Sequence, residues 1–404
     1  MPRIRTPSPS ALRHAPKKPH GEEECILVLQ GGGALGAYQA GVFESMSEGS
    51  HAPDWVAGIS IGAINAALIA GNPAEKRVQQ LAEFWNRVSS ACLQSHGAGG
   101  ALPREAINES NAALSAVFGV PGFYVPRVPP APFQPPGTPG AISYYDTAPL
   151  KETLEELIDF DLLNSGSMRL SVGAVNVRSG NFAYFDTAMQ RLDVRHVMAS
   201  GALPPAFAPI EIDGEQYWDG GIVSNTPLQY VLDQRGTRPR LVFQVDLFSA
   251  QGVQPINMAE VSEREKDIRY SSRTRLNTSS ELQREAMAQA ARRLIAKLPP
   301  KLREDPDAQA LKGCGHEASV SVVHLIYRSK HYETQSKDYE FSRQSVEDHW
   351  LAGRTDTTQT LLNPQWVHRK RPASGVQVFD LSLDGPTTAK TVQPSTHLTQ
   401  GVPS

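Results

Sequence analysis

Short apolar runs alternate with helix-forming stretches through the first part of the chain. The runs Cys25–Leu29 and Leu241–Leu247 are typical of strands buried in a parallel sheet. A third run, Trp55–Ala57, leads through a short turn into Ala63–Ala70, whose small and apolar residues favour a helix. Because strand and helix signals alternate, the pattern predicts a layered α/β/α fold with a mainly parallel central sheet.

The spacing of apolar residues predicts further elements. Helical spacing over 77–88, and a proline in the first turn of 146–158, each predict a helix. Apolar runs over 170–177 and 182–185, separated by a Ser-Gly-Asn turn, predict a hairpin. The later predicted elements are a charged amphipathic helix within 262–297, a strand over 319–327 and a helix over 339–351.

Composition changes along the chain and predicts its organisation. The expected parts are a disordered basic N-terminal arm over 1–24, a main α/β domain over 25–250, a C-terminal α-rich extension with a late strand over 251–363, and a mostly disordered tail over 364–404. Within the main domain the pattern breaks at about 97–140, where prolines mix with aromatic residues. A long insertion of this kind is typical of a functional flap or of disorder. Its aromatic residues suggest the hypothesis that this Pro-rich flap covers a binding cleft.

Ser60 lies in the pentapeptide Gly58–Gly62, between a strand signal and a helix signal. A sharp strand-to-helix turn strains its central residue, and glycines such as Gly58 and Gly62 relieve the crowding and leave the hydroxyl exposed. An ordinary glycine-containing turn has the same composition, so the pentapeptide alone leaves both interpretations open. Ser60 is therefore a candidate nucleophile.

A glycine-rich loop comes before this turn. Gly31, Gly32 and Gly33 follow the first strand directly. The N–H groups of successive glycines can converge at a helix N-terminus, where they attract either a dinucleotide pyrophosphate or the oxyanion of an acyl intermediate. A dinucleotide site needs an acid at the end of the second strand. Asp54 instead opens that strand, so the acyl interpretation is favoured.

A nucleophilic serine also needs a base. Asp219 follows two aromatic residues that would bury it and precedes Gly220 and Gly221, which open a turn. An aspartate that only binds the backbone of its own turn is the structural alternative. A free aspartate is a poor base for a hydroxyl, but burial beside the aromatic residues would raise its pKa.

Together these motifs resemble the patatin-like phospholipase family, over about residues 25–250. Gly31–Gly36 resembles its oxyanion loop, with Gly36 as motif support. Gly58–Gly62 resembles its nucleophile elbow, and Asp219–Gly221 its aspartate motif. Ala199–Phe207 resembles the family's segment ahead of that aspartate. The elements beyond residue 250 resemble an uncharacterised C-terminal extension found in one bacterial branch of the family.

The resemblance implies a serine lipid acyl hydrolase, of phospholipase A or esterase type, that uses a Ser60–Asp219 dyad and no histidine. It implies no metal or organic cofactor, and a lipid or other acyl ester as the binding partner. One departure concerns Leu35, because many members carry Arg or Lys there; the anion hole would then consist of backbone N–H groups alone. Two alternatives stay open: an esterase acting on storage polymers or short hydroxyacid esters, and a catalytically inactive lipid-binding scaffold.

A histidine-assisted triad is the rival mechanism. Serine-elbow hydrolases place nucleophile, acid and histidine in that chain order, which His316, His324 and His331 satisfy. His324 lies in an alternating apolar segment, so a position on a strand face is favoured. His196 could reach the cleft but is expected to be structural.

Composition narrows the function classes. The chain has 404 residues, 40% of them apolar, and a net charge of −3, which gives no support for nucleic-acid binding. Its three cysteines make no disulfide or metal pattern, which favours a reducing, cytoplasmic location. No apolar run approaches the ~20 residues of a transmembrane helix. Peripheral membrane contact stays open through the basic face of residues 280–300, although a solvated helix packed on the domain is the simpler interpretation.

Overall fold

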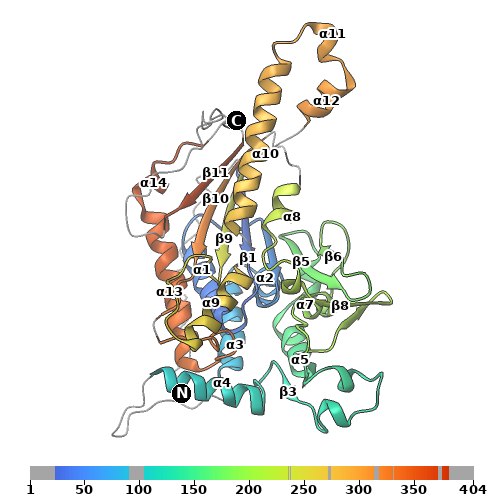
Figure 1. Ribbon diagram of the computed structural model, residues 1–404, viewed down its shortest axis with the longest axis vertical. Helices are drawn as coiled ribbons and strands as arrows, with labels where there is room; N and C mark the ends of the chain where they lie inside the picture. The colour runs from blue at the N-terminus through green and yellow to red at the C-terminus, as the bar shows by residue number, and fades with distance from the viewer. Residues whose placement is uncertain are drawn as a thin grey trace, which may run out of the picture.

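The computed structural model describes residues 23–90, 104–234, 236, 238–271, 274–313, 318–330, 332–371 and 375–381. All but the last two residues of the predicted N-terminal arm therefore lie outside the described residues, as does most of the predicted tail. Figure 1 shows a central sheet with helices on both faces and a long helical projection at one end. This confirms the predicted α/β fold.

A nine-stranded sheet forms the centre of the described structure. Its order is β11-β10-β9-β1-β2-β5-β8-β7, and β6 also pairs with β5. The six strands from β11 to β5 are parallel, whereas β6, β7 and β8 join by antiparallel pairing. The strands are β1 (Glu24–Leu29), β2 (Trp55–Ile59), β5 (Arg169–Asn176), β6 (Phe182–Asp186), β7 (Ile210–Ile212), β8 (Glu215–Asp219), β9 (Arg240–Asp246), β10 (Ser319–Ile326) and β11 (Gly375–Asp380).

Helices cover both faces of this sheet (Figure 1). They are α1 (Gly36–Glu48), α2 (Ile61–Ala70), α3 (Arg77–Val88), α4 (Arg104–Phe118), α5 (Ala148–Leu157), α6 (Phe160–Leu163), α7 (Val194–Ser200), α8 (Leu228–Asp233), α9 (Met258–Tyr270), α10 (Thr274–Ile295), α11 (Pro300–Arg303), α12 (Pro306–Lys312), α13 (Arg343–Leu362) and α14 (Pro364–Val367). Short 3-10 turns are η2 (Gly33–Leu35), η3 (Ala131–Phe133), η4 (Pro139–Ile142) and η5 (Gly220–Ile222), and β3 (Val125–Pro126) pairs with β4 (Tyr145–Asp146).

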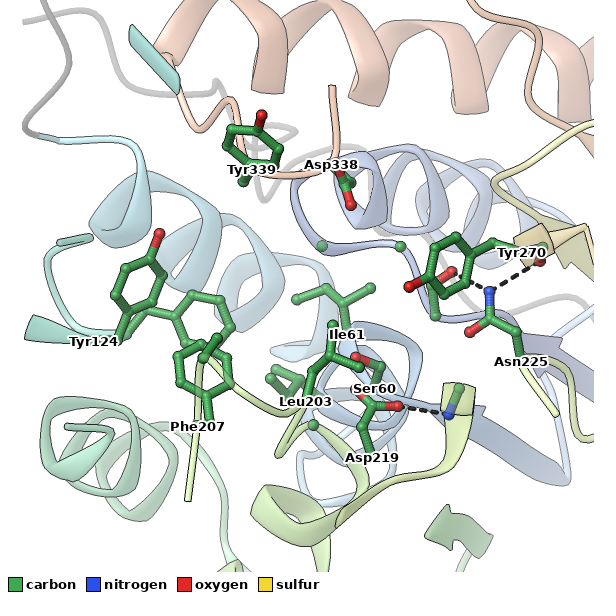
Figure 2. Close-up of a pocket in the computed structure, with 18 of the residues that line it drawn as sticks. Ser60, Ile61, Tyr124, Leu203, Phe207, Asp219, Asn225, Tyr270, Asp338 and Tyr339 are labelled. Carbon is green, nitrogen blue, oxygen red and sulfur yellow. Dashed lines mark hydrogen bonds between the residues drawn. The ribbon is translucent and has the colours of Figure 1, made fainter. Parts of the chain in front are cut away.

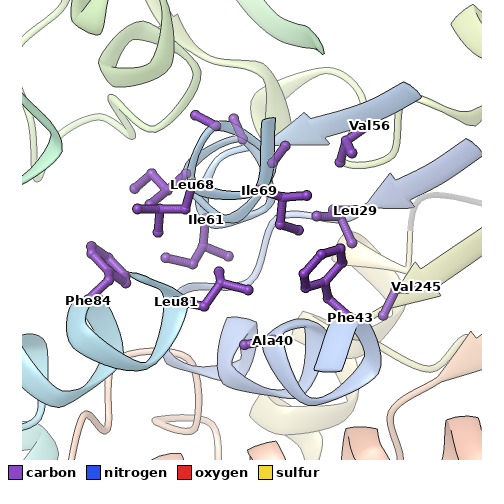
Figure 3. Close-up of a cluster of buried hydrophobic side chains, with 14 of the residues drawn as sticks. Leu29, Ala40, Phe43, Val56, Ile61, Leu68, Ile69, Leu81, Phe84 and Val245 are labelled. Carbon is purple, nitrogen blue, oxygen red and sulfur yellow. The ribbon is translucent and has the colours of Figure 1, made fainter. Parts of the chain in front are cut away.

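The apolar run of β1 divides between two cores because successive side chains point to opposite faces. Leu27 and Leu29 join the larger cluster with α1, α2 and α3, part of which Figure 3 shows. Ile26 and Val28 join a second cluster with α8 on the other face. Burial on both faces explains why the run has no polar alternation.

The C-terminal extension continues the same sheet. β10 pairs in parallel with β9, and α13 packs against α1. The contact between the two helices is close: a Cβ added to Gly41 would lie 1.9 Å from the carbonyl oxygen of Trp350. The predicted strand at 319–327 is confirmed, whereas the predicted helix at 339–351 begins later and runs to Leu362.

The prediction of a mostly disordered tail from residue 364 is wrong for two of its described segments. Pro364–Val367 form α14, and Gly375–Asp380 form the edge strand β11, which pairs in parallel with β10. Trp366 and Phe379 pack edge to face inside the core. A half-buried edge strand has only a weak alternating pattern, and the charged residues before it obscured the signal.

The Pro-rich flap also contains regular structure that the sequence pattern did not predict. α4 occupies Arg104–Phe118, and the prolines that follow lie in short turns around η3 and η4. In α10, Met287 and Leu294 of the predicted apolar face are exposed, while Ala288 and Ile295 are buried. None of the helices in the described residues is long and apolar enough to span a bilayer.

Candidate active site

Ser60 occupies the turn between β2 and α2. Its φ is 56°, a left-handed conformation that is strained for a residue with a side chain. The turn is so tight that a Cβ on Gly58 would lie 2.3 Å from the Gly62 carbonyl oxygen, and one on Gly62 would lie 2.4 Å from that of Leu29. Glycine at both positions therefore allows this conformation, and the half-buried Ser60 lines a pocket.

Asp219 lies beside Ser60 because of strand register. β5 lies between β2 and β8, where Ile59 pairs with Gly173 and Asp219 pairs with the next residue, Ala174. The Ser60 hydroxyl lies close enough to the Asp219 carboxylate to lower its pKa, as a hydrogen-bond donor does. The end of α7 and the turn after it form one segment, which binds the ends of β2 and β8. Figure 2 shows the two side chains together at the base of the pocket.

That segment makes four hydrogen bonds. The Ser60 N–H donates to the carbonyl oxygen (3.1 Å) and the hydroxyl oxygen (3.0 Å) of Ser200. The Ser200 hydroxyl in turn donates to the carbonyl of Gly173, at 2.6 Å. The Asp219 N–H donates to the carbonyl of Ala202, at 3.0 Å. These bonds fix the elbow and the aspartate relative to each other.

Burial controls the acidity of Asp219, whose exposed fraction is 2%. Loss of hydration raises its pKa from 3.8 to about 7. The nearby Ser60 hydroxyl and a hydrogen bond from the Gly221 N–H, at 2.6 Å, lower the pKa and so act in the opposite direction. Gly220 and Gly221 form the start of η5, which directs this N–H toward the carboxylate. A pKa near neutrality suits a general base.

The glycine-rich loop lies opposite this pair. The Gly31 N–H donates to the Asn225 carbonyl (3.2 Å), and the Ala34 N–H donates to the Asp338 carbonyl (2.7 Å). Within the described residues, the N–H groups of Gly32 and Gly33 have no hydrogen-bond acceptor. Gly31, Gly32 and Gly33 all line the pocket, whereas Gly36 begins α1. Two amides are thus available to an anion at the pocket.

A pocket of about 280 Å³ connects these groups. Apolar side chains dominate its walls; among them are Ile61, Ile64, Phe123, Tyr124, Leu203 and Phe207. Lys, Arg and His are absent from the described residues that line it. The pocket therefore fits an apolar acyl chain better than an anionic group.

The flap takes part in this pocket with only some of its aromatic residues. Phe123 and Tyr124 line the pocket, and their rings pack on Phe207 at centroid distances of 6.1 and 5.4 Å. Phe133, in contrast, is 77% exposed. This geometry agrees with the hypothesis that the flap covers a binding cleft, but only for residues 123 and 124.

Of the histidines considered for a triad, His196 and His324 lie within the described residues, and neither lines the pocket of Ser60. His196 is buried at the start of α7, where its Nδ1 accepts from the Asp193 N–H at 3.0 Å. His324 is buried within β10 and does not line the pocket. His316 and His331 lie outside the described residues.

The structure also shows where Leu35 and Asp54 lie. Leu35 is fully buried in the larger core cluster, so its side chain does not reach the pocket. Asp54 opens β2, where its carboxylate accepts from the Cys25 N–H at 3.0 Å. This end of β2 is opposite the glycine loop, so Asp54 cannot serve a dinucleotide there.

Sequence reasoning assigned no role to three polar residues of the pocket. Asn225, Tyr270 and Asp338 all line it, and each contributes a backbone carbonyl to the hydrogen bonds around the glycine loop. Asn225 follows the aspartate motif closely and could have been suspected. Tyr270 and Asp338 come from the C-terminal extension, where no local pattern distinguishes them.

Comparison with known proteins adds the following. The chain is similar to the solved structure of VipD from Legionella pneumophila, with 15% identity and a TM-score of 0.37, over 85% of this chain and 68% of that one. It is also similar to the type III effector protein ExoU, with 14% identity and a TM-score of 0.26, over 82% of this chain and 54% of that one. No curated protein matches the sequence.

Two family models match the chain. A model described as Patatin phospholipase matches residues 268–373, which include most of the C-terminal extension and the first residues of the predicted tail. A model described as Patatin-like phospholipase matches residues 27–232, which is more than half of the 404 residues. The chain belongs to the patatin-like phospholipase family.

Proposed function

We propose that this protein is a serine lipid acyl hydrolase whose nucleophile is Ser60 and whose base is Asp219. Membership of the family supports lipid hydrolysis as the class of reaction. The observation that carries the proposal is the position of the Ser60 hydroxyl beside a buried carboxylate with a pKa near neutrality, at the base of one pocket. No other acid–base pair with these properties reaches the pocket among the described residues.

The proposed reaction proceeds in two halves. Asp219 takes the Ser60 proton as Oγ attacks the ester carbonyl, and the oxyanion receives hydrogen bonds from the N–H groups of Gly32 and Gly33. The proton then passes from Asp219 to the departing alkoxide, which leaves an acyl-enzyme. Water, activated by the same carboxylate, attacks the acyl group, and the fatty acid leaves as Ser60 recovers its proton.

The apolar walls support an acyl chain as the group bound in the pocket. Burial of such a chain is favourable by about 0.8 kcal/mol for each methylene. Because no cation lines the described pocket, we propose that any charged head group lies outside it. An oxyanion hole made only of backbone N–H groups agrees with the buried position of Leu35.

We further propose that the flap makes peripheral contact with lipid surfaces. Between Glu109 and Asp146 the sequence contains one charged residue, Arg127, and that residue pairs with Asp146. Several apolar side chains of this region are exposed: Val117, Phe118, Val128, Phe133 and Tyr144. An exposed apolar area of this kind is typical of a membrane-contact surface. The α10 projection lies at the far end of the molecule from the flap (Figure 1), which favours the flap over residues 280–300.

A hydrolysis panel tests the proposed function. It comprises phosphatidylcholine, phosphatidylglycerol, triacylglycerol, p-nitrophenyl esters of increasing chain length and hydroxyalkanoate oligomers. We expect fatty-acid release from lipid esters, and its loss in Ser60→Ala and Asp219→Asn with fold retained. Release from hydroxyalkanoate oligomers alone would favour the storage-polymer alternative, and full activity in either variant would refute the dyad.

A further inference from the structure

The C-terminal extension holds the glycine-rich loop at both of its ends. At the far end, the Ala34 N–H donates to the Asp338 carbonyl, at 2.7 Å. At the near end, the Asn225 side-chain amide donates to the carbonyls of Gly31 (2.9 Å) and Tyr270 (3.1 Å), as Figure 2 shows. Asp338 and Tyr270 both belong to the extension. The two N–H groups without an acceptor therefore lie between two anchored ends.

The contact at the far end is unusually close. Gly33 has a φ of 54°, and a Cβ added to it would lie 1.9 Å from the carbonyl oxygen of Asp338. Only glycine fits against this carbonyl. A displacement of Asp338 would consequently change the direction of the neighbouring N–H groups.

Helix α9 fixes the segment 335–339, which we call the brace. Lys266 donates to the carbonyl of Gln335 (2.7 Å), forms an ion pair with the Asp338 carboxylate, and lies 5.2 Å from the centre of the Tyr339 ring. Three different groups of the brace thus meet one ammonium group.

A second lysine ties the brace to the same helix. Lys337 is buried, and its Nζ binds Glu263 (3.0 Å) and Asp267 (2.7 Å) of α9. Since α9 ends at Tyr270, one helix connects both anchors of the glycine loop.

We infer that the extension positions the oxyanion loop, with Lys266 and Asp338 as positioning residues for hydrolysis. This inference rests on the proposed function. Asp338 lines the pocket, so the charge of Lys266 also neutralises a carboxylate that would otherwise repel a developing oxyanion. Removal of Lys266 loosens the brace at Gln335 and Asp338, while Lys337 still ties it to α9, and it exposes the Asp338 charge to the reaction.

The experiment compares Lys266→Met, Lys266→Arg and a control, Lys151→Met. Lys151 pairs with Glu155 on the exposed face of α5, so its substitution makes the same chemical change away from the loop. Hydrogen–deuterium exchange of a peptide covering residues 30–36 is the first measurement, with a peptide from β9 as the internal reference. The second is kcat and KM for a soluble p-nitrophenyl ester.

We expect Lys266→Met to accelerate exchange in residues 30–36 by about tenfold and to lower kcat by about tenfold with little change in KM, because misplaced donors cost rate rather than binding. Lys266→Arg keeps the positive charge, so it should keep the exchange rate and kcat close to those of the wild type. Lys151→Met should leave the exchange rate and kcat unchanged. If Lys266→Met leaves the exchange rate of residues 30–36 unchanged, the inference is overturned, whatever the activity of the variant. If the wild-type protein hydrolyses no ester, the proposed function is overturned. The exchange rates of Lys266→Met and wild type then still test whether the extension positions the loop. If Lys266→Met fails to fold, Lys266→Gln, which removes the charge that pairs with Asp338, replaces it in the comparison.

Discussion

The substitution Asp219→Asn should remove a dependence of stability on pH that the buried carboxylate creates. Asparagine keeps the shape of the side chain, and its oxygen can still accept from the Gly221 N–H, which now binds Asp219 at 2.6 Å. It cannot ionise. The wild-type folded protein, in contrast, must hold a charged carboxylate in a buried position once the pH exceeds its pKa.

The magnitude follows from the raised pKa. Burial shifts Asp219 from 3.8 to about 7. Between these values the folded state keeps a proton that the unfolded state has released, so the free energy of unfolding falls as pH rises, by about 1.4 kcal/mol per pH unit. From pH 5 to pH 8 the free energy of unfolding of the wild type should fall by about 2.5 kcal/mol through this group. The fall is smaller than three full pH units would give, because it stops above the folded-state pKa. The asparagine variant should not show this loss.

Urea unfolding, followed by tryptophan fluorescence at pH 5, 6, 7 and 8, measures this effect. The difference between variant and wild type cancels the contributions of other titrating groups, and it should move in favour of the variant by about 2.5 kcal/mol across the range. Ser60→Ala is the matched control, because it keeps the carboxylate and must therefore keep the loss. A difference that stays constant with pH would refute the assignment of a raised pKa to Asp219.

Three further predictions concern activity. As the base, Asp219 must be ionised, so kcat/KM should rise with pH and reach half its plateau near pH 7; a flat profile from pH 5 to 9 would exclude it. Ser200→Ala removes the hydroxyl that accepts from the Ser60 N–H, and should lower kcat by about tenfold in ester assays because the elbow is misplaced. An unchanged kcat would show that the elbow keeps its position without this hydrogen bond. The double variant Phe118→Ser and Phe133→Ser should weaken binding to phosphatidylcholine vesicles in flotation and lower activity on them, while activity on soluble esters persists. Met189→Ser, at a residue that is exposed outside the flap, should have no such effect, and equal vesicle binding in all three proteins would contradict a role for the flap.

The sequence could predict those parts of the fold and site that depend on local signals. The buried strands β1, β2 and β9 have strong apolar runs, and the glycines around Ser60 indicate a tight turn. The order of the motifs along the chain also led to the family, which the family model confirms. What local signals cannot provide is register between distant strands. The approach of Asp219 to Ser60 depends on the pairing of β5 with both β2 and β8.

Long-range contacts explain most of what the sequence missed. The carbonyl of Asp338 contacts a loop about three hundred residues earlier through a backbone group, which any residue type could supply. α4 was missed because it begins next to a break in the pattern and ends before a series of prolines. β11 was missed because an edge strand needs only alternate burial.

Capture of the acyl-enzyme tests the central claim most directly. The protein is quenched in acid during turnover of a long-chain p-nitrophenyl ester, and its peptides are mapped by mass spectrometry. The account predicts a fatty acyl group on Ser60 in the wild type and none in Ser60→Ala. Turnover without an adduct on Ser60, or an adduct on another residue that persists in Ser60→Ala, would contradict it.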